Sequence, residues 1–110
     1  QINLPNALTL DSQNNILYFI DSFNFRIRKI NLNSGIISTL VGDGTSNIAP
    51  SGSFGNQTGI NSPTGIALDL NNNFLFYSDT SNHIIRRVDL ISTRVFTIAG
   101  RNRFPGFSGD

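Results

Sequence analysis

The 110-residue sequence contains no cysteine, which excludes disulfide bonds, thiolate metal sites and thiol catalysis. It also lacks glutamate, methionine and tryptophan and has a single lysine, so the usual helix-forming surface residues are almost missing. The formal net charge of +1 provides no strong field to attract nucleic acid or an anionic membrane. No apolar run approaches the roughly 18 residues that a membrane-spanning helix needs. The length suits one small domain.

The residues that are abundant favour turns and strands. Asn occurs 15 times, Ser 12 times and Gly 10 times, and these residues are typical of turns. Between them lie short groups of Ile, Val, Phe and Thr, which are typical of strands. The composition therefore predicts an all-β protein.

The sequence repeats itself at a spacing of 58 residues. Residues 4–44 align with residues 62–102 without a gap, and 14 of the 41 pairs are identical. The identical pairs include Asp11/Asp69, Asp21/Asp79 and Arg28/Arg86. A repeat of this length indicates two copies of one supersecondary unit.

Each copy contains four short apolar runs separated by turn residues. In the first copy the runs are residues 7–10, 16–20, 26–32 and 36–41, and in the second they are 65–68, 74–78, 84–90 and 94–99. The separators have the lengths and residue types of hairpin connections. Each copy is therefore predicted to be a four-stranded antiparallel meander, with no helix longer than one turn.

The second run of each copy indicates how the sheets pack. Residues 16–20 are apolar at every position, and residues 74–77 repeat this pattern. A strand with one exposed face normally alternates apolar and polar residues, so these runs predict strands covered on both faces. A small antiparallel sheet stacked between copies of itself is a β-propeller blade. Two blades do not close a ring, so further blades are expected to cover their faces.

These features divide the chain into three parts. Residues 1–44 form the first blade, residues 45–61 form a Gly/Ser/Asn-rich loop between blades, and residues 62–110 form the second blade with the start of the next loop. We expect the segment 45–61 to be an ordered surface loop or a flexible insertion, not a helix. Because the sequence stops inside the second such loop, we expect a fragment of a longer repeat protein.

The motifs of the second copy resemble the NHL repeat. They read SPTGIALD at residues 62–69, NFLFYSD at 73–79 and NHIIRRVD at 82–89. The NHL pattern has a Pro-x-Gly-Ile-Ala-Val-Asp opening, an Asn-Ile-Tyr-Val-Ala-Asp strand and an Asn-His-Arg-Ile strand. The first copy departs from it, with Ala7 in place of the glycine and Phe25 in place of the histidine. The resemblance covers nearly the whole chain and implies a β-propeller with four-stranded blades.

Neither the histidine nor the recurring aspartates predict catalysis. His83 is the only histidine, whereas a metal site needs several convergent ligands, so we expect a turn role and no metal. Paired-carboxylate chemistry would need two aspartates to converge on one substrate. The aspartates instead recur at equivalent positions, as structural residues that accept hydrogen bonds in turns do. No catalytic residue and no cofactor are expected.

Two weaker signals are candidate binding or modification sites. A basic strip on successive blades could bind RNA phosphates, as some NHL domains do; it comprises Arg26, Arg28, Lys29, Arg86 and Arg87. Nearby aspartates and the net charge of +1 favour a solvated strand instead. Asn56-Gln57-Thr58 is an N-glycosylation sequon in a polar loop.

The sequence thus predicts a non-catalytic structural or protein-interaction module of a larger NHL-repeat propeller, in an extracellular or cell-surface protein. Its expected partners are flanking blades of the same chain or copies of this chain, with protein ligands as a further option. Nucleic acid and membrane insertion are not expected. Two alternatives stay open: an RNA-binding NHL propeller, and part of an enzyme whose active site lies in other blades.

Overall fold

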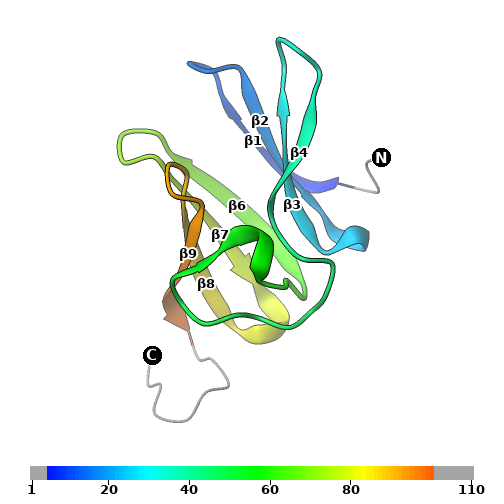
Figure 1. Cartoon of the computed structure of the whole chain (residues 1–110), viewed down its shortest axis with the longest axis vertical. Coiled ribbons are helices and arrows are strands. Elements are labelled where there is room, and N and C mark those ends of the chain that lie inside the picture. The colour runs from blue at the N-terminus through cyan, green and yellow to red at the C-terminus, as the bar shows by residue number, and fades with distance from the viewer. Residues whose placement is uncertain (1–4, 101–110) are drawn as a thin grey trace.

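The computed structural model describes residues 5–100, apart from the side chains of Pro5, Asn6 and Phe23. Within this range the chain forms two antiparallel sheets (Figure 1). The first sheet, blade 1, has the order β1-β2-β3-β4 and consists of β1 (Pro5–Asp11), β2 (Ile16–Asp21), β3 (Arg26–Asn31) and β4 (Ile37–Val41). Each strand pairs with the next one along the chain, so blade 1 is the predicted meander.

The second sheet, blade 2, repeats this arrangement and adds one short strand. Its order is β5-β9-β8-β7-β6, formed by β6 (Pro63–Asp69), β7 (Phe74–Asp79), β8 (Ile84–Asp89), β9 (Arg94–Gly100) and the two-residue β5 (Ser53–Phe54). All eight predicted strands are therefore confirmed. The sequence did not predict β5, because two residues are too few to show a pattern.

Helical structure in residues 5–100 is limited to three single turns. These are the 3-10 turns η1 (Ser22–Asn24), η2 (Gly55–Gln57) and η3 (Thr80–Asn82). The expectation that no helix exceeds one turn is confirmed for this part of the chain. None of the helices described there has the length and hydrophobicity to span a membrane.

The two blades share the same irregularities as well as the same strands. The pairing of β1 with β2 shifts between Pro5 and Leu8, and that of β6 with β7 shifts between Pro63 and Gly65. The pairing of β3 with β4 shifts between Ile27 and Arg28, and that of β8 with β9 shifts at the equivalent place, between Ile85 and Arg86. The sequence repeat is therefore a structural repeat down to its β-bulges.

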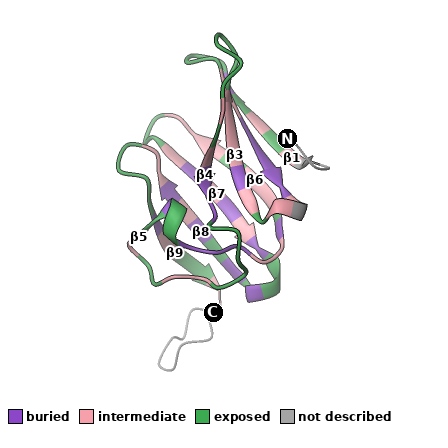
Figure 2. Cartoon of the chain, turned by 45° about the vertical axis from the view of Figure 1, so that its right-hand side comes forward, coloured by how far each residue is buried: buried purple, intermediate pink, exposed green. Residues whose placement is uncertain are grey.

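The hydrophobic core lies between the two sheets, and Figure 2 shows buried residues on the strands of both. Blade 1 contributes Tyr18, Ile20, Ile27, Leu40 and Val41, blade 2 contributes Leu75, Tyr77, Val88 and Val95, and Ile60 joins them from the connecting segment. Tyr18 is the repeat equivalent of Phe76, whereas Leu75 is the equivalent of Leu17. Because side chains alternate between faces, the blades meet through opposite faces and stack head to tail.

The central strands differ in how completely they are covered. In β2 the consecutive residues Tyr18, Phe19 and Ile20 are all buried, so both faces of this strand are covered there, as predicted. In β7 the burial alternates: Leu75 and Tyr77 are buried but Phe76 is only half-buried. The predicted coverage of both faces is therefore incomplete in blade 2, because no neighbouring sheet lies on the Phe76 side within the described residues.

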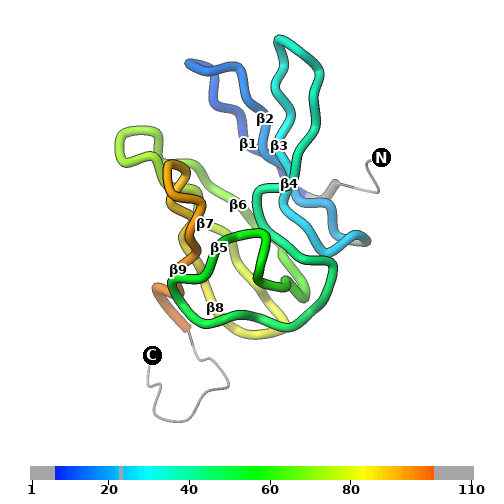
Figure 3. Tube along the Cα trace, in the orientation of Figure 1, coloured from blue at the N-terminus to red at the C-terminus, as the bar shows by residue number. Residues whose placement is uncertain are grey.

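Residues 45–61 form an ordered strap that crosses blade 2 (Figure 3). The strap pairs with β9 through β5, and Gly55 donates a backbone hydrogen bond to the carbonyl of Thr93. Its end turns inward, where Thr58 and Ile60 are fully buried. The expectation of a surface loop thus holds only for the first part. Gly59 allows the inward turn, since a Cβ there would collide with the backbone of Thr45 and Asn47.

Candidate functional site

The aspartates that end the first strand of each blade hold the following turn. The Asp11 carboxylate accepts hydrogen bonds from the backbone N–H groups of Gln13 and Asn14, both at 3.0 Å, and from the Asn14 side chain at 2.8 Å. Burial alone would raise the pKa of Asp11, but these hydrogen bonds outweigh it and leave the pKa below its ordinary value. The equivalent Asp69 accepts a bond from Asn72 at 2.9 Å.

The aspartates that end the second strand have the same kind of role. Asp79 is fully buried and accepts backbone hydrogen bonds from Asn61 at 3.2 Å and Ser62 at 3.1 Å, as well as one from the Asn82 side chain at 3.0 Å. It therefore fastens the end of the strap to the β7–β8 turn. In blade 1, Asp21 accepts a hydrogen bond from Asn24 at 2.9 Å.

His83 has the backbone role that the repeat predicts for it. Its backbone is left-handed, with φ of 58°, and its N–H donates to the carbonyl of Thr80 at 3.1 Å, which closes η3. Phe25 holds the same conformation in blade 1, so an imidazole is not required there. Nowhere between residues 5 and 100 do three or more His, Cys, Asp or Glu side chains gather as metal ligands would.

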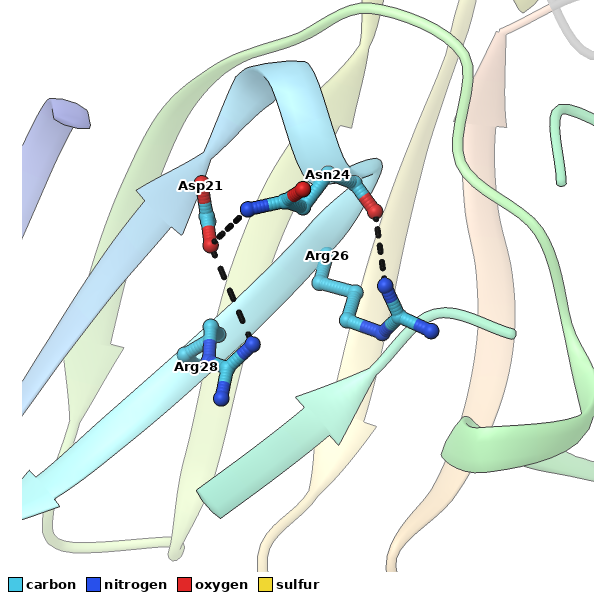
Figure 4. A network of polar contacts seen from close by, with 4 residues as sticks. All are labelled: Asp21, Asn24, Arg26 and Arg28. Carbon is cyan, nitrogen blue, oxygen red and sulfur yellow. Dashed lines mark hydrogen bonds and ion pairs between the residues drawn. The ribbon is translucent and has the colours of Figure 1, made fainter. Parts of the chain in front are cut away.

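The five residues of the predicted basic strip do not form one surface. Figure 4 shows Arg26 donating to the carbonyl of Asn24 at 3.1 Å, while Arg28 lies 3.9 Å from the Asp21 carboxylate. Arg87 lies on the other side of the molecule, where its guanidinium stacks 4.4 Å from the Phe74 ring centroid and 4.9 Å from that of Phe96.

The remaining two cations of the strip are separated from these as well. Lys29 follows Arg28 in β3 and therefore points to the opposite face, where it lines a hollow of about 230 Å³ with Ile16 and Ser38. Arg86 is fully buried beneath the strap. The structure thus brings Arg26 and Arg28 to one side of blade 1 and separates the other three.

Arg86 joins the strap to blade 2 through two side-chain hydrogen bonds, whereas the sequence-based prediction placed it on the surface. Its Nη1 donates to the Thr58 hydroxyl at 3.1 Å and its Nη2 to the Ala49 carbonyl at 2.9 Å. The signal that could have located it is the alternation of β8, since Ile84 and Val88 flank it two residues away on the same face. Burial raises the pKa of the Tyr77 hydroxyl well above its usual range, although the positive charge of the neighbouring Arg86 acts in the opposite direction.

The sequon at Asn56 is exposed at its acceptor residue and buried at its hydroxyl residue. Asn56 lies in η2 on the surface. The Thr58 hydroxyl accepts hydrogen bonds from the Ala49 N–H at 2.8 Å and from Arg86. Thr58 therefore has a structural function that is independent of glycosylation.

Two apolar surfaces remain at the ends of the stack. The outer face of blade 1 is formed by Leu8, Leu10, Leu17, Phe19 and Arg28, which register pairs place on one side of the sheet. On this face Leu8 is 60% exposed and Leu10 is 50% exposed, whereas Phe19 is buried. The repeat predicted that two blades leave faces for further blades to cover, and the structure shows which residues form them; Ile27 is not among them, because it is buried between the blades.

The outer face of blade 2 is formed by Ala67, Phe74, Phe76, Ile85 and Arg87. Ile85 is 43% exposed, whereas its repeat equivalent Ile27 is 0% exposed because it packs against the other blade. Phe76, Ala67 and Ile85 help to line a shallow hollow of about 290 Å³. The outer face of blade 2 is thus an uncovered version of a surface that is covered in blade 1.

Comparison with known proteins gives matches to NHL-repeat proteins, although no family model matches the chain. NHL repeat-containing protein 2 from Homo sapiens is 36% identical over 86 residues, which cover 78% of this chain and 12% of that protein. The Bos taurus protein of the same name is 34% identical over the same share of each chain. Protein Suppressor of Quenching 1, chloroplastic, from Arabidopsis thaliana is 34% identical over 99 residues, covering 90% of this chain and 9% of that protein. The chain therefore spans about a tenth of the length of these relatives.

A solved structure shows the same fold. An auxiliary nutrient binding protein from Bacteroides thetaiotaomicron superposes with a TM-score of 0.65 over 87% of this chain and 25% of its own, at 16% sequence identity. The repeat motifs, the two equivalent four-stranded meanders and the sequence matches agree with one another. The chain therefore belongs to the NHL-repeat β-propeller family and supplies two of its blades.

Proposed function

We propose that the chain is a non-catalytic structural and protein-interaction module within a larger NHL-repeat propeller. The observation that carries this proposal is the contrast between Ile27, which is 0% exposed, and its equivalent Ile85, which is 43% exposed on the outer face of blade 2. Contiguous apolar surfaces of this kind mark contact sites. A further blade of the same type is the partner that fits this face.

The polar residues support a structural role over a catalytic one. Asp11 and Asp79 use their carboxylates to accept backbone hydrogen bonds, and Arg86 is committed to the strap. Groups that hold turns and straps are not free to transfer protons to a substrate. If the whole protein is instead an enzyme whose active site lies in other blades, these residues would still have the same structural roles.

Side-chain footprinting in a longer protein that carries this segment tests the proposal. Leu8 and Ile85 should react with hydroxyl radicals in the 110-residue chain, at a dilution at which it is monomeric, and become protected in the longer protein, while Ile27 should be protected in both. Ile91, which is 79% exposed in the β8–β9 turn, is the control that should react in both. Reaction of Leu8 and Ile85 in the longer protein would contradict the proposed stacking.

The RNA-binding alternative makes a different prediction. A single-stranded RNA labelled with a fluorophore should show no saturable anisotropy change with the chain, because the five candidate cations do not share a surface. Saturable binding that is lost in an Arg26→Gln/Arg28→Gln variant would support RNA binding as the function, in place of protein interaction. These two residues are chosen because they lie on the same side of blade 1.

For the setting of the protein, we propose an extracellular or cell-surface location, supported by the exposed Asn56 of the sequon. The name of the Arabidopsis thaliana relative places that protein in the chloroplast and favours an organelle as the alternative. After expression through the secretory pathway of cultured cells, the chain should carry an endoglycosidase-sensitive mass that the Asn56→Gln variant lacks. If the mass does not change, the sequon gives no support to this setting.

A further inference from the structure

The two outer faces are complementary to each other, and we infer that a second copy of this chain docks head to tail. In this arrangement the outer face of blade 2 of one copy packs on the outer face of blade 1 of the next. The inference rests on the proposed function, because it assigns a partner to the same faces. It differs in that the partner is this chain itself.

The internal repeat supplies the first argument. Phe76 and Ile85 on the outer face of blade 2 are the repeat equivalents of Tyr18 and Ile27, which belong to the core between the blades. Likewise, Leu17 on the outer face of blade 1 corresponds to Leu75, which is buried between the blades. A junction between two copies would therefore repeat the junction already present within one copy.

The shapes of the two faces supply the second argument. Leu8 and Leu10 project from the outer face of blade 1, with 60% and 50% of their surfaces exposed. Their equivalents Ile66 and Leu68 are partly buried against the core at the existing junction. On the outer face of blade 2, the hollow of about 290 Å³ beside Ala67 offers space for such apolar side chains.

The charges at the junction are also compatible with docking. A new junction would bring Arg87 on one copy near Arg28 on the next. The equivalent cations lie on the two faces that already meet within one copy: Lys29 lines a hollow on that face of blade 1, and Arg86 is buried on that face of blade 2. Arg87 is held over Phe74 and Phe96, so its charge faces aromatic rings that attract it. Like charge therefore does not exclude this contact.

Head-to-tail contacts close into a ring when the rotation between neighbours allows it. Propellers typically have about 4–8 blades, so a ring made of two-blade chains contains roughly two to four copies. A symmetric contact, in which two copies join through the same face, would instead stop at two.

Native mass spectrometry and light scattering of the 110-residue chain test this inference. The wild-type chain should form a closed oligomer of two to four copies, as roughly expected from the blade number. Leu8→Asp blocks the outer face of blade 1 and Ile85→Asp blocks that of blade 2, so each variant alone should be a folded monomer. Both residues are exposed in the single chain, so neither substitution places a charge in its core.

The decisive sample is the equimolar mixture of the two variants. Leu8→Asp retains an intact outer face of blade 2 and Ile85→Asp retains an intact outer face of blade 1, so the mixture should form a one-to-one heterodimer. Ile91→Asp, in an exposed turn away from both faces, is the matched control and should keep the wild-type mass. A monomeric wild-type chain, a mixture that stays monomeric, or a single variant that still self-associates would each overturn the inference.

These outcomes are separable from those of the proposed function. A folded monomer at all concentrations, together with protection of Leu8 and Ile85 in a longer protein, would reject assembly between copies and leave stacking on flanking blades intact. If both residues are exposed in the longer protein and the short chain self-associates, stacking on flanking blades is rejected and assembly between copies is supported.

Discussion

The two blades place identical residues at several equivalent positions but in different environments, and the comparison separates what the repeat determines from what a neighbour determines. Ile27 and Ile85 occupy equivalent strand positions, yet the first is 0% and the second 43% exposed. Arg86 and Arg28 are also equivalent, yet Arg86 is bound by the strap and Arg28 lies beside Asp21 at 3.9 Å. Backbone conformation thus follows the repeat, whereas burial follows the position of a residue within the stack.

The largest difference between the blades should appear when the two isoleucines are truncated. Ile27→Ala should reduce the free energy of unfolding by about 2–5 kcal/mol, because it leaves a cavity in the core between the blades. Ile85→Ala should cost less than about 1 kcal/mol, since the side chain is already partly hydrated. Urea denaturation measures both, in the Leu8→Asp background so that assembly cannot cover Ile85. Equal losses would show that the two positions are equally packed.

A smaller difference is expected for the two arginines. Arg86→Lys should cost about 1.5–3 kcal/mol, because one ammonium cannot reproduce the two divergent hydrogen bonds to Thr58 and Ala49. Arg28→Lys should change the stability by less than about 0.5 kcal/mol, because its ion pair is long and partly exposed. Denaturation of the two variants side by side measures the difference. A cost at Arg28 that matches the one at Arg86 would contradict the role assigned to the strap.

Replacing the turn aspartates should change the free energy of unfolding by smaller and unequal amounts, and the difference should depend on pH. Asp11→Asn should cost about 1 kcal/mol at pH 7, because a neutral amide accepts the bonds of Gln13 and Asn14 more weakly. Asp69→Asn should cost less, because the Asp69 carboxylate accepts a hydrogen bond from the side chain of Asn72, whereas Asp11 also accepts two from backbone N–H groups. The pKa of folded Asp11 is lowered, so its contribution is complete above the unfolded pKa of about 3.9 and is lost as the pH falls through the folded value.

The check is the slope of stability against pH in acid. Asp11→Asn should flatten the decline in unfolding free energy below about pH 4, relative to the wild-type chain. Asp69→Asn is the matched control for removing one carboxylate at the equivalent turn. An unchanged slope in the Asp11 variant would show that its hydrogen bonds do not favour the charged form.

The smallest expected effect is a gain in stability in the turn between the last two strands of blade 2. Thr93 has a left-handed backbone with φ of 62°, and the equivalent residue of blade 1 is Gly35 with φ of 77°. Thr93→Gly should raise the free energy of unfolding by about 0.5–1 kcal/mol, because a β-branched residue is strained there. Gly35→Thr should lower it by a similar amount. The space around Gly35 is open, so the cost comes from the left-handed backbone conformation alone. Two changes of the same sign would refute this explanation.

Much of the fold could be predicted because the repeat and the turn residues are local signals. All eight strands follow from apolar runs bounded by turn residues, and the two blades follow from the alignment of one copy with the other. The strap could not be predicted in the same way. Its inward turn depends on Thr58 and Ile60 meeting Arg86 and the core, and these contacts join segments that share no periodic pattern.

The candidate basic strip was predicted wrongly because the direction of side chains along the strand was not considered. The basic strip grouped Arg86 with Arg87, although consecutive strand residues point to opposite faces. The structure buries Arg86 and stacks Arg87 on Phe74 and Phe96. The end faces were more predictable, because two blades of a stacked repeat must leave two surfaces uncovered.

The head-to-tail contact between the blades is the central claim, and nuclear Overhauser effects between methyl groups test it most directly. In the Leu8→Asp background, methyl groups of Ile20, Ile27 and Val41 in blade 1 should show cross-peaks to methyl groups of Leu75 and Val88 in blade 2, which belong to the same core. Ile85 should show none to blade 1. Cross-peaks from Ile85 to blade 1, or none between Leu75 and blade 1, would contradict the account.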